Sequence, residues 1–386
     1  MLPVRPPRPA GSAGGPDPAR RALALWLLSR GAVAVLVLAG ARQLAGAPAG
    51  AVPGFLERWD RWDVDLFRKV AEHGYAGYPE AYPDRGIEAF FPGFPLVLAL
   101  VHRVVPDWTA AGLLVSLAAG AAAAVWLARL AALDGLPGDR VVLYLVLSPY
   151  AVFLAAGYSE ALFLCVAVPG WWCARQGHWR AAGLLVAGAC LVRVSGLFLA
   201  LGLVVHAAVE LRRAGSPRAL LAAGVAWLLA PFAVLVAHAA YLHALTGDWL
   251  RWLHAQGDGW GREATAPWTA LHTTLAAAAD PAQGPEYAWS FRAEVVAVLV
   301  GVVVTGVLVR RARWGEATYV GLSVAALATS SFYLSVARAT LLWFPLWLLL
   351  AEAAQRRAWV HPAYVTVAAP LMALGVLSFT AGRWVG

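Results

Sequence analysis

Long apolar runs separated by short basic clusters constrain this chain more than any other feature of its sequence. The runs occupy residues 21–45, 90–106, 109–132, 140–156, 159–174, 180–192, 194–211, 219–245, 293–310, 316–333, 339–354 and 362–380. Only 13% of the 386 residues are charged, whereas a soluble protein carries roughly 25%, so an ordinary soluble enzyme is excluded. The pattern predicts an all-α polytopic membrane protein of about 10 to 12 transmembrane helices, in which runs shorter than ~20 residues form half-helices or broken pairs.

The start of the chain differs in composition from the rest. Residues 1–20 are rich in Pro, Gly and Arg and have no apolar period, so we expect a disordered cytoplasmic tail. No small-residue cleavage site ends the first apolar run, which favours a transmembrane helix over a signal peptide. Residues 21–386 are then expected to form a single transmembrane domain.

The basic clusters predict which loops face the cytoplasm. They lie at residues 20–21, 212–218, 310–313 and 356–357, and Arg-rich clusters favour the cytoplasmic side of a membrane. The long hydrophilic loops 46–88 and 246–292, and the turn at 334–338, are therefore expected on the extracytoplasmic side. Counting crossings from the first helix places the 212–218 cluster on the wrong side. Either 90–132 or 180–211 must therefore contain a segment that does not span or two runs that are fused into one span.

The basic charge fits membrane anchoring better than nucleic-acid binding. The formal net charge is +8, and Lys69 is the single lysine among 30 basic residues. A nucleic-acid surface needs a basic face on a soluble module, so we expect membrane lipids as partners and no nucleic acid. The abundance of Arg, Ala and Gly suits a GC-rich bacterial genome, and we expect a multi-pass protein of the bacterial plasma membrane.

The cysteines give no sign of a metal centre or a disulfide framework. Cys165, Cys173 and Cys190 lie inside apolar runs without metal-ligand spacing, which predicts buried thiols. The sequence leaves metal dependence open, and a divalent cation is retained as a candidate cofactor.

The first loop contains a short segment with one apolar and one polar face. On a helix that turns about 100° per residue, Trp62, Phe67 and Val70 share an apolar stripe, and the segment is expected to lie along the membrane interface. Asp63 falls in the middle of this stripe, whereas Asp65 is on the polar face and Asp60 at its edge. A carboxylate held on the apolar face would be desolvated and suited to a general base. The alternative is an Asp that caps a helix or forms a salt bridge.

Three further polar residues interrupt apolar sequence. Glu160 follows Tyr158 and Ser159 at a break between runs, where it serves either as a helix-capping acid or as a site residue. Arg193 and Arg338 stand alone, without neighbouring clusters, and an isolated charge in a membrane is costly unless it is paired or used. Binding a phosphate is one use, and anchoring at the interface is the other.

The second loop combines aromatic and polar side chains. Tryptophans at 249, 252, 260, 268 and 289 alternate with Asp248, Gln256, Asp258, Arg262 and Glu263. Indole rings that stack on sugars, together with planar polar groups, would form a glycan site. An aromatic belt at the membrane interface explains the tryptophans but not the polar residues between them.

Taken in order along the chain, these motifs resemble the PIG-V family of mannosyltransferases, which belongs to the GT-C class of polytopic glycosyltransferases. The matching elements are Trp62-Asp63-x-x-x-Phe67, Ala71-Glu72-His73-Gly74-Tyr75, Ala89-Phe90-Phe91-Pro92-Gly93-Phe94-Pro95, and Tyr158-Ser159-Glu160-Ala161-Leu162-Phe163. Elements around Arg193, Gly247 to Trp268, and Arg338 to Leu346 resemble blocks of bacterial relatives. Two features differ or are ambiguous: Leu66 replaces an aromatic or His, and the Trp59-Asp60 pair duplicates the Trp62-Asp63 motif.

The resemblance implies a GT-C-like bundle with an amphipathic helix in the first extracytoplasmic loop. It also implies a polyprenyl- or dolichyl-phosphate mannose donor and an inverting reaction at the outer membrane face. Asp63 would be the catalytic base, and Arg193 and Arg338 would stabilise the leaving phosphate. We predict further substrate-binding residues at Asp60, Asp65, Tyr158, Glu160, Gln256, Trp260 and Arg262.

Two functions from different classes fit the sequence, and a third is weaker. The first is a mannosyltransferase that uses a polyprenyl-phosphate sugar donor and acts on a cell-envelope glycolipid, glycan or protein acceptor. The second is a transporter or flippase of a lipid-linked sugar, without catalysis. A transport path needs ionisable groups within the spans, and their scarcity favours the enzyme. A non-catalytic scaffold subunit is the third reading.

Overall fold

The computed structural model describes residues 17–43, 53–76, 86–214, 224–282 and 284–385. All regular secondary structure in these ranges is helical, apart from one isolated bridge between Ala264 and Ser330. The long helices are α1 (Pro18–Gln43), α4 (Trp108–Leu133), α8 (Ser195–Ala214), α10 (Ala230–Thr246), α13 (Pro285–Arg310) and α17 (Val360–Thr380). Residues 1–16 of the predicted tail lie outside the described residues. Its last residues, from Pro18 on, already belong to α1, so this helix begins earlier than the predicted start at residue 21.

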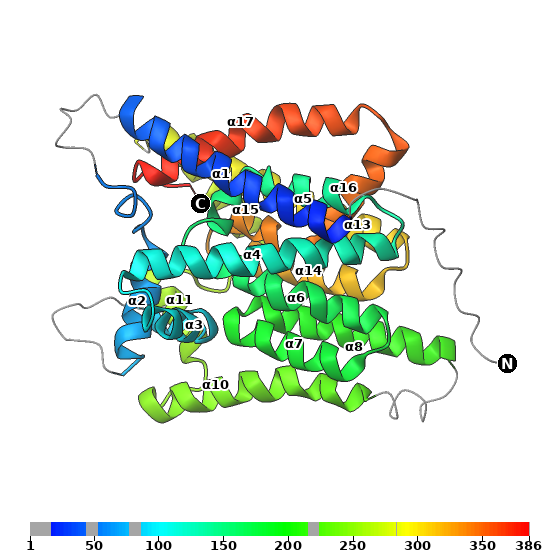
Figure 1. Cartoon of the computed structure of the whole chain (residues 1–386). Helices are drawn as coiled ribbons and strands as arrows, with labels where there is room; N and C mark the ends of the chain where they lie inside the picture. The colour runs from blue at the N-terminus through cyan, green and yellow to red at the C-terminus, as the bar shows by residue number, and fades with distance from the viewer. Residues whose placement is uncertain (1–16, 44–52, 77–85, 215–223, 283, 386) are drawn as a thin grey trace.

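Shorter helices connect and cover the long ones (Figure 1). They are α2 (Asp63–His73), α3 (Gly93–His102), α5 (Gly138–Val146), α6 (Ser159–Arg175), α7 (Trp179–Val192), α11 (Arg251–Trp260), α12 (Pro267–Ala279), α14 (Trp314–Ala328), α15 (Val336–Ala339) and α16 (Phe344–Arg356). Four 3₁₀ turns complete the described set: η1 (Ile87–Ala89), η2 (Ala151–Leu154), η3 (Val225–Leu229) and η4 (Thr340–Leu342). The predicted second loop is thus largely helical, because α11, α12 and the start of α13 lie within 246–292.

The all-helical, multi-span class expected from the sequence is confirmed, but fewer helices reach full span length than predicted. In the part of the chain that the structure describes, six helices are long and apolar enough to cross a membrane, or seven if the pair Val336–Leu342 and Phe344–Arg356, bent by 75°, is one span. The sequence predicted about 10 to 12. The difference arises because runs such as those of α3 and α7 form short apolar helices of 10 and 14 residues.

Small residues allow the long helices to approach one another closely. A Cβ atom added to Gly202 on α8 would lie 2.6 Å from the carbonyl oxygen of Gly315 on α14, and one added to Gly120 on α4 would overlap the ring of Trp26 on α1. The Trp26 indole N–H also donates to the carbonyl of Leu117 at 3.0 Å. Such small-residue contacts bring helix backbones together where lipid removes the hydrophobic driving force.

We expect Gly202→Ala to destabilise the protein by about 1–3 kcal/mol, because its methyl group meets a backbone carbonyl that cannot move aside cheaply. Gly306→Ala on α13 is the matched control, since nothing lies within 4 Å of its added Cβ. There the higher helix propensity of Ala should leave stability unchanged or raised. Thermal unfolding in detergent measures both. Equal melting temperatures for the two variants would contradict the close α8–α14 contact.

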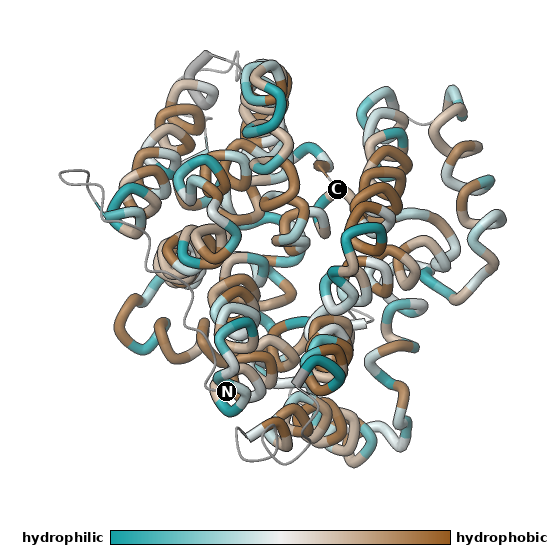
Figure 2. Tube along the Cα trace, turned by 90° about the vertical axis from the view of Figure 1, so that its right-hand side faces the viewer, coloured by the Kyte–Doolittle hydropathy of each residue, from teal (hydrophilic) through white to brown (hydrophobic). Residues whose placement is uncertain are grey.

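Salt bridges gather the basic clusters at one end of the bundle. Asp134, after α4, binds Arg175 at 2.8 Å and Arg313 at 3.4 Å, while Glu352 on α16 binds both Arg311 and Arg356. We call this the basic end. Figure 2 looks toward it along the helices and shows hydrophilic residues at helix termini and hydrophobic stretches between them. At the opposite end, which we call the loop end, α2 packs on α3 and α11 on η1 (Figure 1).

The short helix α3 resolves the conflict in the predicted topology. It has 10 residues and packs at the loop end against α2 and α4. The apolar run at 90–106 therefore does not cross the bundle, and the non-spanning segment lies within 90–132 rather than within 180–211. When this run is not counted as a crossing, the crossings from α1 onward place Arg212 and Arg213 on the same side as the start of α1. This agrees with the structure, in which α8 ends at the basic end (Figure 1).

Candidate active site

Asp63 is the first residue of α2, and the chain turns at the residue before it, Trp62. Trp62 has a positive φ of 47°, which is uncommon for a residue with a side chain. It turns the chain immediately before the helix. The inward face of α2 consists of Val64, Phe67 and Val70. The predicted helical stripe was therefore wrong at its start: Trp62 precedes the helix and packs on Phe379 with ring centroids 5.1 Å apart.

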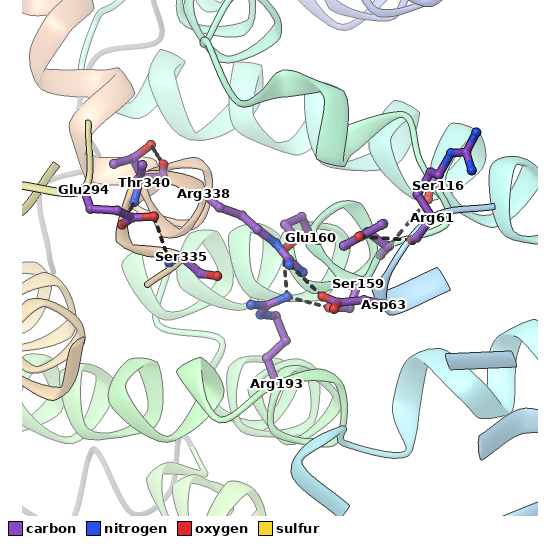
Figure 3. Close-up of polar contacts among 12 residues, drawn as sticks. Arg61, Asp63, Ser116, Ser159, Glu160, Arg193, Glu294, Ser335, Arg338 and Thr340 are labelled. Carbon is purple, nitrogen blue, oxygen red and sulfur yellow. Dashed lines mark hydrogen bonds and ion pairs between the residues drawn. The ribbon is translucent and has the colours of Figure 1, made fainter. Parts of the chain in front are cut away.

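Four charged side chains from distant parts of the sequence form one chain of contacts (Figure 3). The Nη1 atom of Arg338 donates to Oδ2 of Asp63 at 2.7 Å, and its Nε atom donates to Oε1 of Glu160. The same Glu160 oxygen accepts from Nη1 of Arg193 at 2.7 Å, which also donates to the Ser159 hydroxyl at 2.6 Å. Two carboxylates thus alternate with two guanidinium groups.

The cluster is largely shielded from water, so its charges are stable only if they are paired and hydrogen-bonded with good geometry. Glu160 is fully buried and the Arg338 side chain is 7% exposed, whereas Asp63 and Arg193 keep partial exposure. The Arg338 guanidinium also lies over the rings of Tyr158, at 4.5 Å, and Phe153, at 4.7 Å. Opposite charges, short hydrogen bonds and cation–π contacts together offset the cost of removing these charges from water.

A pocket of about 430 Å³ opens beside the cluster. Six residues predicted for the site line it: Asp63, Arg193, Gln256, Trp260, Arg262 and Arg338. Aromatic walls are formed by Phe90, Phe91, Trp252, Trp343 and Trp384. The two long loops therefore meet at one cavity, and Arg251 on α11 holds them together by binding Glu88 on η1 at 3.0 Å.

The second wall of the pocket carries Arg262. Its Nε atom donates to the Ser330 hydroxyl at 3.2 Å and its Nη1 atom to the Gln256 side-chain oxygen at 3.4 Å. Burial lowers the pKa of the Arg262 guanidinium, and the charge of Glu294 opposes that shift. Among the described residues, Arg262 has no carboxylate within salt-bridge distance, so it contributes positive charge to the cavity.

Four predicted residues are not part of the cavity lining: Glu160, which belongs to the buried charge cluster, and Asp60, Asp65 and Tyr158. Asp60 and Asp65 both bind Arg68 on the outer side of α2, and each carboxylate is about one third exposed. Tyr158 lies behind Arg338, and its hydroxyl donates to the Arg61 carbonyl at 3.3 Å. The structure thus separates the two Trp-Asp pairs, since Asp63 lines the pocket and Asp60 does not.

Sequence reasoning missed one buried residue that supports the cluster. Glu294 on α13 is 2% exposed and accepts hydrogen bonds from the backbone at Ser335 and the two residues after it, next to Arg338 (Figure 3). The sequence feature that could have identified Glu294 is its position as a lone acidic residue at the start of the apolar run 293–310. No group of three or more His, Cys, Asp or Glu side chains suited to a metal ion occurs within the described ranges, and metal dependence stays open.

Comparison with known proteins gives the family. The model of the family described as Mannosyltransferase (PIG-V) matches residues 40–241, which include Asp63, Glu160 and Arg193. GPI alpha-1,6-mannosyltransferase 2 of Cricetulus griseus is 38% identical over 169 residues, covering 40% of this chain and 33% of the relative. The proteins of the same name from Mus musculus and Homo sapiens are 37% and 34% identical over 177 residues, covering 42% of this chain and 34% of each relative.

The alignments thus span about one third of the length of these relatives. The family match is broader, since it covers more than half of this chain, from the end of α1 into α10. It includes the motif-bearing first loop and three of the four members of the charge cluster, Asp63, Glu160 and Arg193. On this evidence, the chain belongs to the PIG-V mannosyltransferase family.

Proposed function

We propose that this protein transfers a mannosyl residue from a polyprenyl-phosphate donor to a cell-envelope acceptor. The observation that carries the proposal is the shared pocket of Asp63, Arg193 and Arg338, three charged groups from separate segments of the chain in a cavity with aromatic walls. The family match supports a sugar transfer, and the names of the relatives support mannose as the sugar.

Asp63 is suited to act as the general base. Arg338 holds its Oδ2 atom, while no described residue donates to Oδ1, which leaves that atom available to an acceptor hydroxyl. In the proposed step, Asp63 takes the hydroxyl proton as the acceptor oxygen attacks the anomeric carbon of the sugar. The bond between that carbon and the phosphate oxygen breaks, the lipid phosphate leaves with the electron pair, and the anomeric configuration inverts.

The arginines are suited to stabilise the leaving phosphate. Arg193 is 22% exposed, and of its nitrogens only Nη1 is bound to the protein in the described structure. Its remaining donors and those of Arg338 can face the charge that develops on the phosphate. The basic end favours the cytoplasm under the positive-inside rule, so the pocket at the loop end would face the extracytoplasmic side.

The direct test is sugar transfer by the purified protein. We expect label from polyprenyl-phosphate [³H]mannose to appear in a lipid or polymer fraction when membranes are added as acceptor. A dolichyl-phosphate mannose donor tests tolerance of the lipid. Absence of transfer from both donors would overturn the proposal. If the donor instead crosses the bilayer of reconstituted vesicles unchanged, the protein is a transporter.

A further inference from the structure

Glu294 is a buried carboxylate whose hydrogen bonds, among the described residues, are all with the backbone beside the site. Its Oε1 atom accepts from the Ser335 N–H at 2.9 Å, and its Oε2 atom accepts from the Val336 and Ala337 N–H groups at 2.6 and 3.0 Å. Both oxygens are therefore used, and the side chain is not part of the pocket lining. Glu294 cannot contact a substrate in this arrangement.

The backbone that Glu294 holds is the one that carries Arg338. The residue after Ala337 is Arg338, within the four-residue helix α15. Such a short helix has little stability of its own, because a single helical turn fixes many backbone angles for few hydrogen bonds. Ser335 before it has a left-handed φ of 61°, which is unfavourable for a serine without outside support. Three hydrogen bonds to one carboxylate supply that support.

Residues 329–335 connect α14 to α15, and the start of this segment is held by other contacts. The carbonyl of Thr329 accepts from the N–H of Thr265 at 2.8 Å, and the Tyr333 N–H donates to the Thr274 hydroxyl at 2.8 Å. The segment between α14 and α15 is thus fixed at its start by residues 265–274 and at its end by Glu294. Losing the Glu294 contacts would release the end that leads into Arg338.

We propose that Glu294 is a positioning residue for catalysis: it fixes the α15 backbone so that Arg338 can hold Asp63 in the geometry needed for proton transfer. Its effect on the rate rests on the proposed sugar transfer, whereas its effect on α15 does not. A displacement of about 1 Å in a catalytic group can lower a rate by about 100-fold. We therefore expect Glu294→Gln to lower kcat by about 10- to 100-fold, with little change in the KM for the donor.

Two further variants distinguish positioning from general destabilisation. Glu294→Asp keeps the carboxylate and should recover part of kcat, while Glu294→Ala should lose more than Glu294→Gln. In an Arg338→Ala background, Glu294→Gln should add little further loss, because both changes act through the same guanidinium. Independent, multiplicative losses in the double variant would overturn the proposal.

Hydrogen exchange tests the geometry without any activity. Peptides containing residues 335–339 should take up deuterium faster in Glu294→Gln than in the unchanged protein. Glu316→Gln is the matched control, because Glu316 is 4% exposed and pairs with Arg313 at the basic end. It should leave exchange at 335–339 and kcat unchanged. Unchanged exchange in Glu294→Gln would refute the proposal even if transfer is observed, whereas increased exchange without any transfer in the unchanged protein would refute only the proposed function.

Discussion

Asp63→Asn is expected to lower kcat for sugar transfer by about 10²- to 10⁴-fold, the usual contribution of a general base. Asparagine matches the size of aspartate, and its side-chain oxygen can still accept the 2.7 Å hydrogen bond from Arg338. It cannot take a proton from the acceptor hydroxyl. The loss should therefore appear in kcat, and the donor should still bind with a similar KM. Initial-rate measurements over a range of donor concentrations separate the two quantities.

Glu57→Gln is the matched control for this experiment. Glu57 is an exposed carboxylate in the same loop and accepts a hydrogen bond from the Gly54 backbone N–H at 2.7 Å. Removing its charge should leave kcat within about twofold, since surface substitutions away from a site have small effects. Equal activity of Asp63→Asn and Glu57→Gln would exclude Asp63 as the base.

Glu160→Ala is expected to cause the largest loss of stability, about 3–5 kcal/mol, because it leaves the buried Arg338 and the partly exposed Arg193 without their shared partner. Glu160 is fully buried, and one of its oxygens accepts from both Arg193 and Arg338. Without it, two guanidinium groups would face each other in a poorly solvated site. Unfolding of the purified protein in detergent, followed by tryptophan fluorescence, measures the effect.

Two comparisons test the cause of that loss. Adding Arg193→Ala to Glu160→Ala should recover part of the stability, because one unpaired charge is removed and Arg338 keeps Asp63. By contrast, Glu210→Ala breaks the exposed bridge to Arg213, and its effect should stay below about 1 kcal/mol. If the double variant is less stable than Glu160→Ala alone, repulsion between the arginines is not the cause.

Much of the fold could be predicted because membrane spans leave a direct trace in composition. Apolar runs located the long helices, and the basic clusters near 311 and 356 do meet at one end of the bundle. Sequence could not set the number of full spans, because an apolar run as short as that of α3 suits a half-helix as well as a span. Helix length and packing at the loop end decided that α3 does not cross.

The candidate site was predictable to the extent that its residues are rare in their surroundings. Arg193 and Arg338 stood out as isolated charges in apolar sequence, and both line the pocket. Asp63 was selected by a helical stripe that began too early, since α2 starts at Asp63 itself. Asp60 had a similar local sequence, and only its contact with Arg68, outside the pocket, separates it from Asp63.

Sequence alone determined the membrane class, the helical content and the candidate charged residues, because these follow from local hydropathy and from the cost of isolated charge in lipid. Tertiary structure decided which charges are partners. Arg338 meets residues 178 and 275 positions earlier in the chain, and Glu294 supports it through backbone N–H groups that any residue type except proline would provide. Such contacts depend on how helices that are distant in sequence pack together, and this packing cannot be predicted from hydrophobic periodicity or residue type.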